Sequence, residues 1–280
     1  MSPLEACAGS LFERPAYLHA VAAELDAEVR VAECAGAFLP LLACSDGVLR
    51  TAPGLPRPYG PNLPLGLGEL ARELTEPEIR LSATLSPLRG GPELARHLSV
   101  RGARLAGERQ ICVTGLHGEG SREFLGELAR RSLGAAAAQG ATAEVAPING
   151  WFGRFQHDAV AFEQPVGVGD SYLAALAKLD HYVIAVHDRH GLAAAALFLC
   201  DGYEAYLHLG GCRADPEPAA AVVSLALAAG IGEAARSGCR VAVLGGGRSD
   251  RPDDPLLQVK LALAGATLPS FTVDVGIVFE

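Results

Sequence analysis

The sequence lacks the cysteine and histidine patterns that indicate a metal site or a disulfide framework. Its seven cysteines are odd in number and scattered, and no CxxC, HxH or HExxH pattern occurs. A metal site needs several ligands at short spacing, and a disulfide framework needs an even set of cysteines. We therefore predict no metal, and we expect the cysteines to be buried free thiols, because most of them stand in apolar, strand-like runs.

Long hydrophobic runs are also missing. The longest, Ala193–Cys200 and Ala219–Ile231, fall well short of a membrane span. The first residues, Met1–Glu5, do not form a basic region followed by an apolar one, so no signal peptide is expected. These absences predict a cytoplasmic protein with no membrane span.

A surplus of positive charge is absent as well. The 280-residue chain has a formal net charge of -9, with 50% hydrophobic and 20% charged residues. This balance is typical of a well-packed globular protein. It argues against a protein that coats nucleic acid, because neutralising phosphates needs clustered Lys and Arg, but it does not exclude contact with an RNA end.

The motifs of the common nucleotide-binding and hydrolytic sites do not occur either. There is no GxSxG, no GxxxxGK[ST] and no GxGxxG. The glycine run Gly245–Gly247 ends a predicted strand with no clear helix after it, so close approach of the backbone to a ligand or a neighbouring segment is the better interpretation.

The sequence does contain the same order of elements twice. Each half reads as a helix followed by three strands, which predicts a duplicated α/β module. The expected elements are Phe12–Leu25, Val29–Cys34, Ala37–Ala43 and Gly47–Ala52 in the first half, and Asp170–Leu179, His181–His187, Leu192–Cys200 and Tyr203–Leu209 in the second.

Other segments complete the expected chain. Pro53–Gly68 is rich in Pro and Gly and predicts a loop, whereas Pro92–His97 and Ser121–Gln139 predict helices. The helix expected at 219–237 is apolar nearly all round and should be buried. We expect strands at 240–244, of the fully apolar type found inside a sheet, and at 271–279.

Lys260 is the residue that most suggests chemistry. It stands alone in the apolar run Leu256–Leu263, after the polar loop Arg248–Asp254. Such a lysine is either a side chain that extends outward to water or a cation held in a site. Its position after a glycine-ended strand favours a site, because ligands of α/β proteins gather at the carboxyl ends of strands.

A series of short segments resembles, in order, the landmarks of the Fem-type aminoacyltransferases, a GNAT-related family that transfers amino acids from aminoacyl-tRNA to peptide amines. The helix that ends at Gly238 also resembles the family's pattern at that place. The other matching segments are Leu11–Leu18, Arg57–Pro61, Ala205–Cys212, Leu244–Gly247 and Gln258–Gly265.

The resemblance implies two GNAT-like modules, each a mixed and mostly antiparallel sheet flanked by helices. We place them at residues 1–135 and 136–280, with the last strand returning to the first module. It also implies direct attack of a peptide amine on the aminoacyl ester, with Lys260 stabilising the oxyanion and no cofactor. Candidate substrate-binding residues are Arg57, Tyr59, Tyr206, His208 and Arg248.

The expected partners are an aminoacyl-tRNA donor and a peptide acceptor, either a cell-wall precursor or a carrier-bound intermediate of antibiotic biosynthesis. Transfer from acyl-CoA or an acyl carrier by the same fold is the alternative. The stretch before the long helix, Cys212–Pro218, has two acids, two prolines and no glycine, which suits a CoA pyrophosphate poorly. A module that keeps the fold without the chemistry is a third interpretation, because Val259 and Leu263 replace the aromatic residues of the family.

Overall fold

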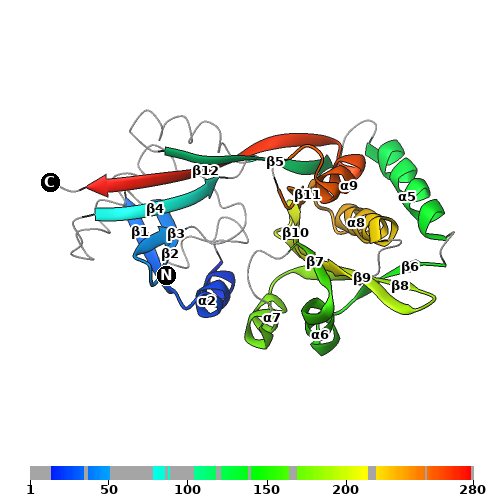
Figure 1. Ribbon diagram of the computed structural model, residues 1–280, viewed down its shortest axis with the longest axis horizontal. Helices are drawn as coiled ribbons and strands as arrows, with labels where there is room; N and C mark the ends of the chain where they lie inside the picture. Colours follow the sequence, from blue (N-terminus) through cyan, green and yellow to red (C-terminus); the bar gives the residue numbers. More distant parts are fainter. Residues whose placement is uncertain are drawn as a thin grey trace. The chain divides into compact units, whose positions relative to one another are not determined.

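The computed structural model describes residues 14–34, 37–50, 78–85, 88, 104–117, 121–137, 140–163, 169–213, 219–249 and 251–278. The chain divides into two compact units, Met1–Arg109 with Pro269–Glu280, and Gln110–Leu268. The expected module boundary after residue 135 stays a prediction. Both units are α/β, with strands flanked by helices (Figure 1).

The first unit is a mostly antiparallel sheet in the order β1-β2-β3-β4-β12, in which β3 and β4 run parallel. Strand β12 pairs with β4 from Phe271 opposite Leu85 to Val278 opposite Glu78, so the end of the chain joins this sheet. The helix of this unit has Pro15 in its first turn, and it buries Tyr17, Leu18 and Val21. The elements are α2 (Pro15–Glu24), β1 (Glu28–Cys34), β2 (Ala37–Ala43), β3 (Val48–Arg50), β4 (Glu78–Leu85) and β12 (Ala266–Val278).

The second unit is a mixed sheet in the order β5-β11-β10-β9-β8-β6, and β7 pairs with β10. Strands β10 and β11 pair in parallel, whereas β6–β8, β8–β9, β9–β10 and β5–β11 are antiparallel. The strands are β5 (Arg104–Gly115), β6 (Thr142–Ala146), β7 (Val160–Glu163), β8 (His181–Asp188), β9 (Gly191–Cys200), β10 (Glu204–Cys212) and β11 (Val241–Gly245). The helices are α5 (Ser121–Ala137), α6 (Gly150–Asp158), α7 (Asp170–Leu176), α8 (Ala219–Arg236) and α9 (Pro255–Leu263).

Helix α8 forms the core of the second unit. It lies against one face of the sheet with α5 and α9, whereas α6 and α7 lie on the other side (Figure 1). Alternate residues of β8, Tyr182, Ile184 and Val186, share its core cluster. Leu225, Leu227 and Ile231 of the helix are at most 2% exposed. The predicted burial of this helix is confirmed.

Two glycines of α8 offer a matched test of this packing. A Cβ on Gly230 would lie 2.2 Å from Cε2 of Phe198, whereas nothing lies within 4 Å of a Cβ on Gly232. The Phe198 ring is also stacked on Tyr182, with 5.1 Å between centroids, so it has little freedom to move.

We expect Gly230→Ala to lower the free energy of unfolding by about 1–3 kcal/mol, because it overpacks the core. Gly232→Ala should raise it by about 1 kcal/mol, because alanine is the better helix former. Urea unfolding of both variants measures the two changes. Shifts of the same sign would contradict this packing.

Several elements differ from those expected. Strands β4, β5, β6 and β7 and helices α6 and α9 were not predicted, and the predicted loop 53–68 and helix 92–97 lie outside the described residues. Helix α7 is preceded by Gly169, with no side-chain cap. Cys112, Cys200, Cys212 and Cys239 are buried free thiols, as predicted, whereas Cys44 is a free thiol that is only half-buried. No helix in the described ranges has the length and apolarity of a membrane span.

Candidate active site

The candidate site lies where the parallel strands β10 and β11 separate. They pair only over three positions, the last being Tyr206 opposite Val243. Beyond that point β10 pairs with β7 instead, with Gly210 opposite Glu163. The register of β10 on β9 also shifts after Leu207, as does that of β11 on β5 after Val243. Backbone groups therefore diverge at the carboxyl ends of two parallel strands, the usual place for a ligand in an α/β sheet.

Lys260 lies at this place and is fully buried. It stands on α9 with Leu256 and Leu263, at the spacing that puts all three on one buried helix face. Its Nζ donates a hydrogen bond to the carbonyl oxygen of Gly246, at 2.8 Å, just beyond the end of β11. The simplest interpretation of the sequence, a side chain that extends outward to water, is therefore wrong. The side chain instead places the lysine Nζ at the end of β11.

The charge of Lys260 also acts on a neighbouring thiol. Cys112 of β5 is opposite Gly245 in the antiparallel register with β11. Burial raises the pKa of the Cys112 thiol, and the nearby Lys260 charge partly opposes that shift. The thiol is therefore kept neutral beside the lysine, so it adds no negative charge that would cancel the cation.

Asp254 fixes the start of the helix that bears Lys260. Its carboxylate accepts hydrogen bonds from Leu257 N at 2.9 Å, Ser249 N at 2.9 Å and Ser249 Oγ at 3.0 Å. These bonds lower the pKa of Asp254 to about 2, with the bond from Leu257 N as the largest cause. The helix that follows the glycine run is thus capped by a residue that sequence analysis placed only in a loop.

Replacement of Asp254 by alanine should lower the melting temperature by a few degrees, because α9 loses its cap and the loop loses its anchor. The carboxyl pKa is depressed in the folded state, so this stability is present above the ordinary pKa of 3.8 and is lost as the pH falls toward 2. Thermal unfolding at pH 7 and pH 3 measures the drop in melting temperature that Asp254→Ala causes. This drop should be smaller at pH 3.

Asp253→Ala is the matched control. Its carboxylate pairs with Arg251 only in solvent, with side chains 68% and 74% exposed, so its loss should have little effect on melting. Equal losses from the two variants would contradict the capping role of Asp254.

The remaining candidate residues occupy different environments. Tyr206 is half-buried at the last parallel pair, and exposed Arg248 donates from Nη2 to the carbonyl oxygen of Ala161 in β7, at 2.8 Å. His208 is fully buried, with Nε2 2.5 Å from the hydroxyl oxygen of Tyr172 in α7. The structure therefore associates Lys260, Tyr206 and Arg248 with the separating strands, and it packs His208 inside. Arg57 and Tyr59 lie outside the described residues.

Comparison with known proteins bears on this arrangement. No family model matches the sequence, and no curated protein does. Among solved structures, FemX matches with a TM-score of 0.66 at 12% identity, over 97% of this chain and 96% of that one. The C-terminal DUF2156 domain of an Agrobacterium fabrum protein, named for lysylphosphatidylglycerol synthetase, matches with a TM-score of 0.64 at 16% identity, over 97% and 91%. A tandem GNAT protein from the clavulanic acid biosynthesis pathway matches with a TM-score of 0.53 at 12% identity, over 88% and 81%.

The chain has the Fem-type, GNAT-related fold. The match extends over nearly the full length of FemX, so it includes both units. The expected fold class, a pair of GNAT-like α/β modules, is confirmed. At these identities the likeness establishes the fold, and the chemistry must be argued from the residues of this chain.

Within this Fem-type fold, packing explains the glycine pair of β10. A Cβ on Gly210 would lie 2.1 Å from Cε2 of Phe162, and one on Gly211 would lie 2.8 Å from Cβ of Ala159. The pair is thus needed because β7 and the end of α6 approach the strand closely. Gly246 and Gly247 are also crowded, the latter by Asp254 Oδ1 at 2.9 Å. These glycines are explained by neighbouring segments rather than by a ligand.

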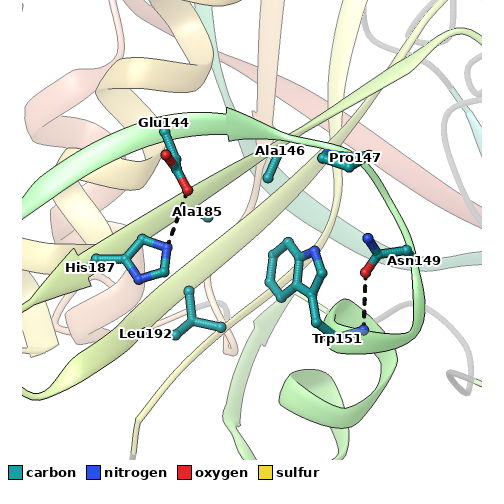
Figure 2. A pocket seen from close by; sticks show the side chains of 8 residues that line it. All are labelled: Glu144, Ala146, Pro147, Asn149, Trp151, Ala185, His187 and Leu192. Carbon is teal, nitrogen blue, oxygen red and sulfur yellow. Dashed lines mark hydrogen bonds and ion pairs between the residues drawn. The ribbon is translucent and has the colours of Figure 1, made fainter.

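A cavity of about 300 Å³ lies elsewhere in the second unit of this Fem-type fold (Figure 2). It is lined by β6, β8 and β9 and by the start of α6, where Asn149 Oδ1 accepts from Trp151 N at 3.0 Å. Sequence analysis did not identify it. The available signal was a helix-capping asparagine two residues before the single tryptophan of the chain.

Proposed function

We propose that this protein is an aminoacyltransferase that moves an amino acid from aminoacyl-tRNA to the amine of a peptide. The observation that carries the proposal is the buried lysine at the end of β11, 0% exposed and 2.8 Å from the Gly246 carbonyl oxygen, in a Fem-type fold. A buried lysine that only fills space is uncommon, because burying its charge costs energy unless something holds it.

The proposed chemistry is a direct attack of the acceptor amine on the carbonyl carbon of the aminoacyl ester. The nitrogen forms the new amide bond, the carbonyl oxygen becomes an oxyanion, and the bond to the tRNA ribose oxygen then breaks. The ribose oxygen gains a proton, and the attacking amine loses one to the substrate's own carboxylate, to the tRNA or to water. Lys260 would supply fixed positive charge to the oxyanion, and such preorganised charge is usually the largest catalytic contribution.

The composition before α8 favours tRNA over CoA as the donor. A CoA pyrophosphate is held by backbone N–H groups at a helix start, but Pro216 and Pro218 have none to offer, and Asp215 and Glu217 would repel it. Aminoacyl-tRNA needs no such loop, and its proposed use agrees with a cytoplasmic location. The acceptor would be a cell-wall precursor peptide or a carrier-bound peptide of antibiotic biosynthesis.

Transfer from acyl-CoA or an acyl carrier is a second candidate. It is favoured by the likeness to the tandem GNAT protein of the clavulanic acid pathway, over 88% of this chain. The parallel strands that separate at Tyr206 would suit the extended arm of such a donor equally well.

Incubation of the purified protein with labelled aminoacyl-tRNAs and a panel of peptide acceptors tests the proposal. We expect transfer of label to the peptide amine, which RNase treatment of the donor abolishes. Phosphatidylglycerol belongs in the panel as a hydroxyl acceptor, because one structural neighbour is named for its lysylation. Activity with acyl-CoA and none with charged tRNA would establish the second candidate instead.

A further inference from the structure

The cavity beside β6 lies at the edge of the sheet of the second unit. In the strand order β6 is terminal, and among the described residues its ladder partner is β8. Glu144 is opposite Ala185, and Thr142 is opposite His187, so alternate residues of β6 face the same side as the cavity. A strand added along the edge of β6 would direct every second side chain toward that side.

The cavity has an apolar floor and one anionic wall. Ala185 and Leu192 lie on its sheet side, with the Trp151 indole beside Leu192 in the view of Figure 2. Glu144 contributes a carboxylate whose side chain is 67% exposed, with Oε1 3.4 Å from Nε2 of His187. An aromatic face next to a carboxylate is the environment that a long, basic side chain prefers, since its methylene groups pack and its charge is paired.

Trp151 is held in place while its ring stays accessible. Its backbone N–H is bound by the Asn149 side chain, and the next residue, Phe152, is fully buried and anchors the helix. The indole itself is only half-buried. A partly exposed tryptophan at the start of a capped helix, beside a terminal strand, is a typical anchor of a peptide-binding surface.

We propose that the edge of β6 and this cavity form a docking site for an extended peptide segment with a basic side chain. The backbone of the peptide pairs with β6, and its lysine or arginine enters the cavity between Trp151 and Glu144. The net charge of -9 favours such a partner. A second copy of this chain fits less well, because antiparallel pairing of two β6 strands about their centres would place two Glu144 carboxylates opposite each other.

Trp151 is the single tryptophan of the chain, so its fluorescence reports on this site directly. The probe is a blocked peptide of about seven residues, alternating valine and threonine around one central lysine. We expect it to change the tryptophan emission in a saturable way. Norleucine in place of lysine should weaken binding by about three- to ten-fold, because the charge contacts are lost. N-methylation of the amides that face β6 should abolish binding.

Glu144→Gln should weaken binding of the lysine peptide as much as the norleucine replacement does. Glu123→Gln, on the exposed side of α5, should leave binding unchanged. The assay contains no donor substrate, so its result is independent of the proposed transfer reaction. An emission that does not change up to about 5 mM peptide, or equal binding of the three peptides, would overturn the proposal. The proposal would also be overturned if the chain alone formed a dimer and the Val145→Lys substitution, on the same strand, dissociated that dimer.

Discussion

Replacement of Lys260 by methionine is expected to reduce aminoacyl transfer by about 100-fold or more. Methionine has nearly the length of lysine and no charge, so it fills the buried space at the end of β11 while removing the cation. The loss should appear in kcat and equally in kcat/KM, because the oxyanion exists only in the transition state. Single-turnover transfer from labelled aminoacyl-tRNA measures it directly.

The fold should tolerate the change, and this separates chemistry from stability. An isosteric apolar residue in a buried ionic position is often neutral or stabilising, so the melting temperature should hold or rise. Lys178→Met, at an exposed position after α7, is the matched control and should have normal activity. A folded Lys260→Met protein with an unchanged rate would refute the oxyanion role.

Sequence reasoning succeeded where the hydrophobic pattern was strong and local. Helix α8 is a long segment that is apolar nearly all round, and the strands of the β8–β9 hairpin are apolar runs about a glycine turn, so their lengths and flanking glycines identify them. It failed for β5, whose first half, Arg104–Gln110, carries three charges and is held in the sheet by its neighbours rather than by its own propensity. Strands β6 and β7, of five and four residues, are too short to show a period.

The candidate site was only partly predictable for a similar reason. Sequence alone pointed to Lys260, but its burial depends on how α9 packs, and α9 begins at a proline that follows a polar loop. The contact of Arg248 with Ala161 joins residues 87 positions apart. Such pairings depend on strand order, which local patterns do not specify.

His208 should make the protein less stable as the pH falls below about 6.5. The side chain is fully buried, and burial lowers its pKa to about 3. Between these values the unfolded chain binds a proton at this histidine and the folded chain does not. The stability is therefore complete above the ordinary pKa of 6.5, and it decreases by about 1.4 kcal/mol per pH unit below it.

Urea unfolding between pH 7.5 and pH 5 isolates this contribution when wild type is compared with His208→Gln. Glutamine is uncharged at every pH and can still bond to the Tyr172 hydroxyl, so the difference between the two slopes belongs to the histidine. Parallel profiles for wild type and His208→Gln would mean that His208 is protonated in the folded protein, as a residue open to substrate and solvent would be. The slope of the free energy of unfolding against pH therefore decides whether His208 belongs to the packed interior or to the substrate-binding surface that the sequence suggested for it.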